Sequence, residues 1–273
     1  MIDLHCHLLP GIDDGALDLA SSLRMARIAV EDGIAVTACT PHIYPGLYQN
    51  TGPAIRQAVL ELQTRIDEAG IPLRLTYGAD THLAPDLVAG LRDGRIPSLH
   101  DSRYFLLEPP HHVAPPRLAE TVFKLLTVGH VPVITHPERL SWIEDHYEVF
   151  VELVGQGAWL QVTAGSLTGR FGATARYWGE RLLDEGWVHI LATDSHDSVY
   201  RPPLLAEGRR AAERWVGTAE ACRLVEINPQ GILNNLEPKS LLAASSSGVA
   251  APICSRRLRL RRLFGIRRLF GIR

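Results

Sequence analysis

The chain has 273 residues, 46% of them hydrophobic and 21% charged, which is enough for the buried core of one large domain. Its formal net charge of −2 is unevenly spread, because eight of the 28 basic residues and none of the 30 acidic residues follow Ser255. The chain before this point is therefore acidic and gives no reason to expect a nucleic-acid partner. The four cysteines form no CxxC pair, so the sequence predicts neither a disulfide framework nor a thiolate zinc site. No apolar run approaches the ~18 residues of a membrane span, so no spanning helix is predicted, and we expect a cytoplasmic protein.

Short apolar runs alternate along the chain with amphipathic segments. Seven runs bounded by Gly, Pro or polar residues are predicted strands: 2–4, 35–39, 73–77, 104–107, 131–135, 158–162 and 188–192. Between them, helical periodicity occurs at 18–32, 53–69, 116–129, 142–155 and 174–186. This alternation predicts an α/β fold with parallel strands joined by helices, most simply a (β/α) barrel, with a doubly wound open sheet as the alternative.

The first predicted strand leads into His5 and His7. Side chains alternate in direction along a strand, so these two imidazoles point the same way and Cys6 points away from them. The Gly- and Asp-rich turn that follows could add Asp14 to the same site. Such a histidine pair alone is more often two ordinary histidines than a metal site. Whether it binds metal therefore has to be judged from the later segments of the chain.

Later strands end in the same kinds of side chain, and in either architecture the carboxyl ends of parallel strands lie together. The candidate metal ligands are His5, His7, Asp14, His42, Asp80, Glu108, His136, Asp194 and His196. Nine nitrogen and oxygen ligands exceed what one ion uses, which predicts a cluster of two or three Mn, Zn, Fe or Mg ions. Local capping of separate strand ends could explain any one of these residues, but it is a poor explanation of the whole series.

Clustered dications suit the hydrolysis of a phosphate monoester, whose oxygens repel the nucleophile. Arg139 and Arg201 follow the fifth and seventh predicted strands and fit as planar donors that bind the phosphate. A cysteine-based mechanism is excluded, because it needs an arginine six residues after the cysteine and no cysteine of this chain has one there.

These motifs resemble those of the PHP (polymerase and histidinol phosphatase) superfamily, and they are most similar to its bacterial protein-tyrosine phosphatases encoded with capsular or exopolysaccharide synthesis genes. The resemblance covers about residues 1–240. Its motifs are His-Cys-His at 5–7, Gly-Ile-Asp-Asp-Gly at 11–15, Thr-Pro-His at 40–42, Glu108, His-Pro-Glu-Arg at 136–139, Asp-Ser-His at 194–196 and Arg-Pro-Pro at 201–203. It implies a distorted (β/α)7 barrel with a trinuclear site that usually favours manganese.

Carried onto matching positions, the resemblance implies three metal sites and a phosphate clamp. The sets are His5, His7, Asp80 and Asp194 for one metal; Asp80, Glu108 and His136 for a second; Asp14, His42 and His196 for a third; and Arg139 and Arg201 for the phosphate. The family usually has Glu where this chain has Asp80, so the shorter carboxylate bridges two metals from a shifted backbone or binds one only. His82 could compensate, although we expect it to be a solvated rim residue.

The function implied by the resemblance is a metal-dependent protein-tyrosine phosphatase that acts on a tyrosine kinase of polysaccharide synthesis. Two alternatives stay open: a small-molecule phosphatase such as histidinol-phosphate phosphatase, and a low-activity barrel that binds the kinase as a regulator. Four further side chains lie in loops near the predicted site. We expect Tyr44 and Tyr48 to pack in the ordinary way and His111 and His112 to be solvated.

Beyond the predicted barrel at 1–242, residues 243–255 include a Ser-rich stretch typical of a flexible linker. Residues 256–273 form a basic tail in which Arg-Arg-Leu-Phe-Gly-Ile occurs twice. We expect this tail to be disordered, with peripheral contact to an anionic membrane surface as the alternative.

Overall fold

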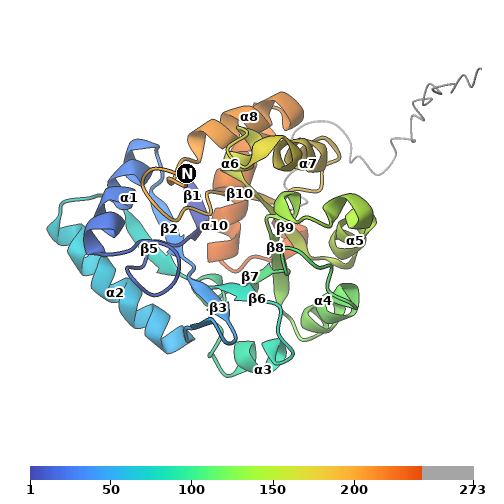
Figure 1. Ribbon diagram of the computed structural model, residues 1–273, viewed down its shortest axis with the longest axis horizontal. Coiled ribbons are helices and arrows are strands. Elements are labelled where there is room, and N and C mark those ends of the chain that lie inside the picture. The colour runs from blue at the N-terminus through green and yellow to red at the C-terminus, as the bar shows by residue number, and fades with distance from the viewer. Residues whose placement is uncertain (242–273) are drawn as a thin grey trace, which may run out of the picture.

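The strands of the computed structural model, which describes residues 1–241, lie at the centre of the molecule with helices outside them (Figure 1). One sheet has the order β1-β2-β5 and the other β10-β9-β8-β7-β6-β3-β4, and all pairs are parallel except β3–β4. The strands are β1 (Ile2–Cys6), β2 (Val36–Cys39), β3 (His42–Tyr44), β4 (Tyr48–Gln49), β5 (Arg74–Tyr77), β6 (Asp80–His82), β7 (Tyr104–Glu108), β8 (Val131–Thr135), β9 (Trp159–Thr163) and β10 (Ile190–Ala192). The predicted linker at 243–255 and basic tail at 256–273 lie outside the described residues.

Hydrogen bonds join the two sheets into a barrel-like arrangement. β3 continues β2 and β6 continues β5, each after two residues, so these four strands occupy two positions. At the other edge, the Asp194 amide donates to the His5 carbonyl over 2.8 Å and the His7 amide to the Ser195 carbonyl over 2.9 Å. The chain that leaves the last strand is thereby paired with the first, as the predicted barrel requires and the open sheet does not.

The helices surround these strands (Figure 1). They are α1 (Leu19–Glu31), α2 (Gly52–Glu68), α3 (Leu87–Arg92), α4 (Leu118–Thr127), α5 (Ile143–Gln156), α6 (Ala164–Leu167), α7 (Gly172–Asp184), α8 (Ala206–Val216), α9 (Thr218–Cys222) and α10 (Asn228–Leu233), with short turns η1 (Leu99–Asp101), η2 (Pro137–Arg139) and η3 (Arg223–Ile227). The five predicted helices and seven predicted strands are confirmed, each end within two residues. The prediction missed the short strands β3, β4 and β6, the short helices α3 and α6, and the helices after residue 186.

Local chemistry explains where the longer helices begin and end. Asp18 accepts a hydrogen bond from the Ser21 amide over 2.7 Å and so caps α1. α2 has Pro53 in its first turn, where the missing N–H costs nothing. α5 ends at Gly157, whose φ of 115° suits glycine.

Adjacent residues of one strand belong to different hydrophobic clusters. Leu106 belongs to an inner cluster, whereas Leu107 belongs to the larger cluster that includes helix residues. The strands are therefore apolar on both faces, and burial of each leucine side chain stabilises the fold by roughly 1.5–3 kcal/mol. Ile232 of α10 and Leu241 complete the inner cluster, so the end of the described chain closes one end of the barrel. The polar carboxyl ends of the strands lie at the other end.

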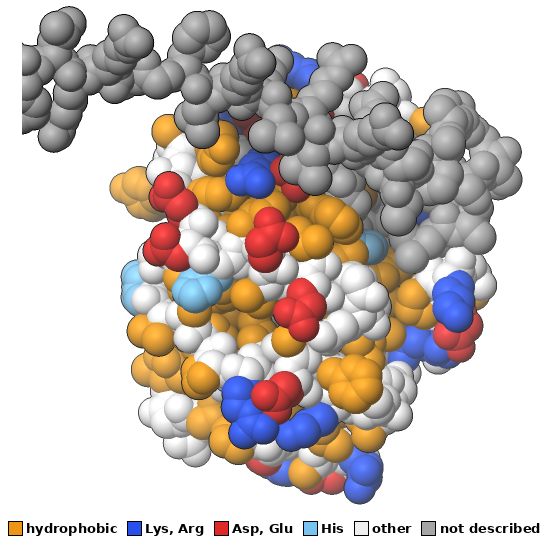
Figure 2. Space-filling model, turned by 90° about the vertical axis from the view of Figure 1, so that its right-hand side faces the viewer, with side chains coloured by type: hydrophobic (Ala, Val, Ile, Leu, Met, Phe, Trp, Pro, Cys, Tyr) orange, Lys and Arg blue, Asp and Glu red, His pale blue; other side chains and the backbone are white. Residues whose placement is uncertain are grey.

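The surface that carries α4 and α5 mixes acidic, basic and apolar side chains (Figure 2). Within residues 1–241, no helix combines the length and the apolar character needed to cross a membrane.

Candidate metal centre

The structure brings the side chains predicted at the strand ends into five overlapping groups, in each of which the possible ligand atoms lie within 4.8 Å of one another. The groups are His7, Asp14, His42 and His196; His5, His7 and Asp80; His5, His136 and Asp194; His42, His82 and Glu108; and Glu108, His111 and His136. All nine predicted side chains occur among them. Because the groups share members, they form one continuous cluster.

His5 and His7 form the floor of this cluster. Their Nε2 atoms lie 3.3 Å apart, and both side chains are fully buried. Each ring is oriented by a second polar contact: His5 Nδ1 lies 3.0 Å from Gln161 Oε1, and His7 Nδ1 lies 2.7 Å from Asp13 Oδ2. Such contacts fix which ring nitrogen faces the cluster, as is typical for histidines that bind metals.

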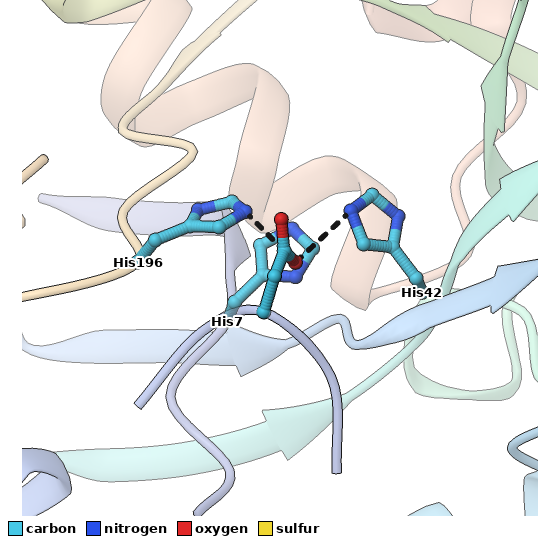
Figure 3. Close-up of side chains that lie close together, drawn as sticks. His7, His42 and His196 are labelled. Atoms are coloured by element: carbon cyan, nitrogen blue, oxygen red, sulfur yellow. Dashed lines mark ion pairs between the residues drawn. The ribbon is translucent and has the colours of Figure 1, made fainter. Parts of the chain in front are cut away.

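Asp14 faces two other histidines across the first loop. Its Oδ1 atom lies 3.4 Å from both His42 Nε2 and His196 Nε2. Figure 3 shows the rings of His7, His42 and His196 converging, with the two ion pairs as dashed lines. The set Asp14, His42 and His196, which the resemblance implies for one metal, is therefore close together, and His7 joins it.

Several buried polar atoms of the cluster have no hydrogen-bond partner. They are Asp80 Oδ2, His42 Nδ1 and His136 Nδ1. A buried polar atom is normally paired, and these atoms are a carboxylate oxygen and imidazole nitrogens, which divalent cations accept as ligands. The donor set therefore fits the cluster of divalent ions that the sequence predicts.

Two residues of the cluster stand at strand ends with unusual backbone angles. His136 directly follows β8 with φ of 34°, and Asp194 lies two residues after β10 with φ of 50°. Positive φ is uncommon for residues other than glycine and often marks functional sites. At both positions the chain turns sharply as it leaves the strand, while the side chain remains in the cluster.

The charges within the cluster compensate one another. Burial lowers the pKa of His5, but the Asp80 and Asp194 carboxylates outweigh it and raise that pKa to about 9. Burial raises the pKa of Glu108, but its contacts with His42 and His82 hold it well below the ordinary value. A protonated His5 and an ionised Glu108 thus belong to the same cluster, whereas burial lowers the pKa of His7 to about 3. Binding of divalent cations would displace the His5 proton.

Asp194 connects this cluster to both candidate phosphate-binding arginines. Its Oδ1 atom lies 3.3 Å from His5 Nε2, whereas Oδ2 pairs with Arg201 Nη2 over 2.6 Å and also with Arg139 Nη1. The Arg139 guanidinium lies over the Phe171 ring, 4.2 Å from its centroid, and that of Arg201 lies 5.7 Å from the same centroid. Both arginines thus stand beside the cluster and share one aromatic ring.

Glu138 holds the Arg139 loop in place. Its Oε1 atom accepts hydrogen bonds from the Thr163 amide over 2.9 Å and from Ser166 Oγ over 2.8 Å. The loop after β8 is thereby tied to the end of β9, which holds in place the backbone from which the Arg139 side chain extends.

The division of the ligands into three metal sites stays a prediction. In the structure Asp194 groups with His5 and His136, and Asp80 groups with His5 and His7. The expectation that His82 is a solvated rim residue was wrong. Its side chain is 13% exposed and its Nε2 atom lies 2.5 Å from Glu108 Oε2, because β6 continues past Asp80 beside β7.

Three other loop residues lie beside the cluster, and one of them, His111, lies closer than expected. His111, expected to be solvated, belongs to the Glu108 and His136 group, and its ring centroid lies 5.2 Å from that of His136. Tyr44 stacks on His82 and Tyr48 on His42, with interplanar angles of 12° and 14°. The tyrosines therefore pack against the cluster as a wall, which agrees with the ordinary packing expected of them.

Sequence reasoning missed Asp13 and Gln161 as orienting residues. Asp13 stands beside Asp14 in the Gly-Asp turn, and Gln161 is a polar residue in an otherwise apolar strand, so a signal was present for both. Cys6 and Cys39 are buried and apart from these groups, and burial raises the pKa of both thiols. Neither thiol therefore has the properties of a nucleophile.

A family model described as "Capsular polysaccharide synthesis, CpsB/CapC" matches residues 1–234. The chain belongs to the CpsB/CapC family. Tyrosine-protein phosphatase YwqE of Bacillus subtilis (strain 168) is 38% identical over 237 residues, which are 86% of this chain and 92% of that protein. Tyrosine-protein phosphatase CpsB of Streptococcus agalactiae is 27% identical over 244 residues, which are 86% of this chain and 99% of that protein.

A solved CpsB/CapC structure has the same fold. It comes from work on YwqE of Bacillus subtilis and CpsB of Streptococcus pneumoniae, described as unique metal-dependent tyrosine phosphatases, and matches with a TM-score of 0.83 and 34% identity. The match covers 87% of this chain and 96% of the solved chain. The described barrel is thus the fold of the CpsB/CapC family over almost its whole length.

Proposed function

We propose that this protein is a metal-dependent protein-tyrosine phosphatase that acts in capsular or exopolysaccharide synthesis. The observation that carries the proposal is the shared Asp194 carboxylate, which faces the histidine cluster with one oxygen and two arginines with the other. Candidate metal ligands and candidate phosphate-binding arginines thereby lie side by side, which supports the proposal. The names of the CpsB/CapC relatives support the same activity.

The cofactor we propose is two or three divalent cations, with manganese as the first candidate and Zn, Fe or Mg as the others. The residues that would hold them are His5, His7, Asp14, His42, Asp80, Glu108, His136, Asp194 and His196. Divalent cations bound there would neutralise the phosphoryl oxygens and make a water acidic enough to attack near neutral pH.

The arginines have a separate role in this mechanism. Arg139 and Arg201 bind the phosphate oxygens, and their planar donors stabilise the charge of the transition state. A water oxygen bonds to phosphorus while the bond between phosphorus and the aryl oxygen breaks, and the phenolate leaves and takes up a proton. A phenol has a pKa of about 10, so the leaving group needs no dedicated general acid.

The alternatives lose support at the site. A barrel without activity would have no need for two arginines held against a candidate metal ligand. Histidinol phosphate is an alkyl ester, whose leaving group is poorer than a phenolate and has a greater need of a proton donor.

The substrate protein we propose is a tyrosine kinase of polysaccharide synthesis that carries phosphotyrosine. The description of the matching family supports the pathway, and the sequence resemblance supports the kinase. For location we propose the cytoplasm, with peripheral membrane contact through the tail at 256–273. Sedimentation with anionic vesicles should be weaker after removal of that tail and weaker in high salt.

The test is hydrolysis by purified protein of a phosphotyrosine peptide and, separately, of histidinol phosphate. Chelation should abolish peptide hydrolysis, and added Mn should restore it. A Cys6→Ser/Cys39→Ser protein serves as the control and should keep substantial activity. Faster turnover of histidinol phosphate than of the peptide, or loss of activity in the cysteine variant with metals still bound, would overturn the proposal.

A further inference from the structure

A cavity of about 230 Å³ opens beside Arg139 and has no role in the mechanism above. It lies between η2, the start of α5 and the start of α7. Its apolar lining comprises Leu140, Ile143, Phe171, Ala175 and Trp178. An apolar cavity of roughly 150 Å³ is known to hold benzene, so this space is large enough for one aromatic ring.

The cavity adjoins the candidate phosphate clamp directly. Arg139 lines it, and Phe171 contributes to its wall while lying under the Arg139 guanidinium. His111 lines it too, and that ring packs beside His136 of the cluster. A phosphate bound by Arg139 would therefore have the histidine cluster on one side and the cavity on the other.

We infer that this cavity binds the aromatic ring of the phosphotyrosine substrate. The inference rests on the proposed function, because it takes the phosphate to be held by Arg139 and Arg201. In-line displacement places the leaving oxygen opposite the attacking water, so the aryl group points away from the cluster of candidate ligands. Phe171 and Trp178 supply the aromatic faces, and Leu140 and Ile143 supply apolar contacts.

The alternative place for the ring is the β3–β4 hairpin. There Tyr44 and Tyr48 could stack on an aryl group, but their rings are already stacked on His82 and His42. One face of each tyrosine ring is thereby taken. The cavity beside Arg139 is favoured over the hairpin because Arg139 of the candidate phosphate clamp lines it.

The test narrows the cavity and measures binding separately from turnover. Ala175→Leu places a larger side chain on the cavity wall, and Thr174→Phe does the same from an exposed position that tolerates replacement. The matched control is Ala119→Leu, beside a second cavity lined by α4 and α5 residues. The probes for the Mn-loaded proteins are phenylphosphonate and inorganic phosphate, measured by calorimetry, together with the KM for a phosphotyrosine peptide.

Both cavity variants should bind phenylphosphonate roughly 10-fold more weakly and raise the KM for the peptide by a similar factor. Their Mn content and affinity for inorganic phosphate should stay within about twofold of the parent, as should every measurement on Ala119→Leu. Unchanged phenylphosphonate affinity in Thr174→Phe, or an equal loss for inorganic phosphate, would overturn the inference. So would a 10-fold loss in Tyr48→Leu without one in the cavity variants.

Failure of the proposed function would look different. In that case the parent protein would hydrolyse no aryl phosphate with any added metal. The two calorimetric measurements would still decide whether the cavity takes an aromatic ring.

Discussion

Arg201 Nη2 donates to Asp194 Oδ2 over 2.6 Å, while the other oxygen of that carboxylate faces His5 Nε2 at 3.3 Å. Arg139 pairs with the same Oδ2 atom. Burial raises the pKa of Asp194, but the charges of Arg201, His5 and Arg139 outweigh it and hold that pKa well below the ordinary value. The carboxylate is therefore ionised at neutral pH, and each arginine keeps it neutralised if the other is removed.

This sharing leads to a prediction for the two arginines. Arg139→Ala or Arg201→Ala should lose roughly 10-fold or more in kcat/KM for a phosphotyrosine peptide, because one charge-assisted contact to the transition state is gone. Arg201→Lys should recover little, since an ammonium group cannot reach both Asp194 and a phosphate as a planar fork does. Metal content measured by elemental analysis should be unchanged in every single variant. A parallel loss of metal would make the arginines structural.

Asp80 is the candidate ligand at which the sequence resemblance led us to expect a glutamate instead. Its Oδ2 atom is buried without a hydrogen bond, 3.4 Å from His5 Nε2 and 3.5 Å from His42 Nδ1. Asp80→Asn keeps the shape and removes the charge, so metal affinity should fall by at least roughly 10-fold, the loss typical even of outer-shell partners. Asp80→Glu should bind Mn as well as the parent or better.

Titration calorimetry with Mn measures both Asp80 variants, and Asp145→Asn on the exposed start of α5 is the control. Full Mn affinity in Asp80→Asn would remove Asp80 from the ligand set.

Gly15 is required by close packing over His7. A Cβ atom at this position would lie 2.3 Å from the His7 carbonyl oxygen and 2.4 Å from His7 Cβ. Gly15→Ala should therefore displace the turn that carries Asp13 and Asp14, lower Mn binding, and cost about 1–3 kcal/mol of stability. Gly155→Ala in α5 meets no atom within 4 Å and should be neutral or slightly stabilising.

Urea unfolding and Mn titration compare these two glycine variants. Normal Mn binding by Gly15→Ala would show that the turn moves without disturbing Asp14.

The strand ends could be predicted from sequence because their signals are local. His5 and His7 are separated by one residue, and apolar runs that stop at polar residues fix where each strand ends. The contacts of His82 and His111 with Glu108 could not be predicted, since they depend on how far β6 continues and on how the loop after β7 folds back. The shared use of Asp194 by Arg139 and Arg201 has the same cause, because it joins loops that are distant in sequence.

His189 provides a pH test of stability away from the candidate metal ligands. It is 7% exposed, its Nδ1 atom accepts a hydrogen bond from the Leu160 amide over 3.2 Å, and its ring stacks on Trp159. Burial lowers the pKa of His189 from 6.5 to about 4. The unfolded chain therefore takes up a proton between these two values while the folded protein does not, and the stabilisation present above pH 6.5 is lost as the pH falls through this window.

Between about pH 7.5 and about pH 5, protonation of His189 in the unfolded chain should lower the free energy of unfolding by about 2 kcal/mol. Other groups titrate over the same range, so the measurement is a difference: urea unfolding of the parent and of His189→Gln at both pH values. The parent should lose about 2 kcal/mol more than the variant, whose amide can still accept from Leu160 without taking up a proton. His146→Gln, at an exposed position of α5, should lose as much as the parent. Equal losses in the parent and in His189→Gln would mean that His189 is protonated in the folded protein.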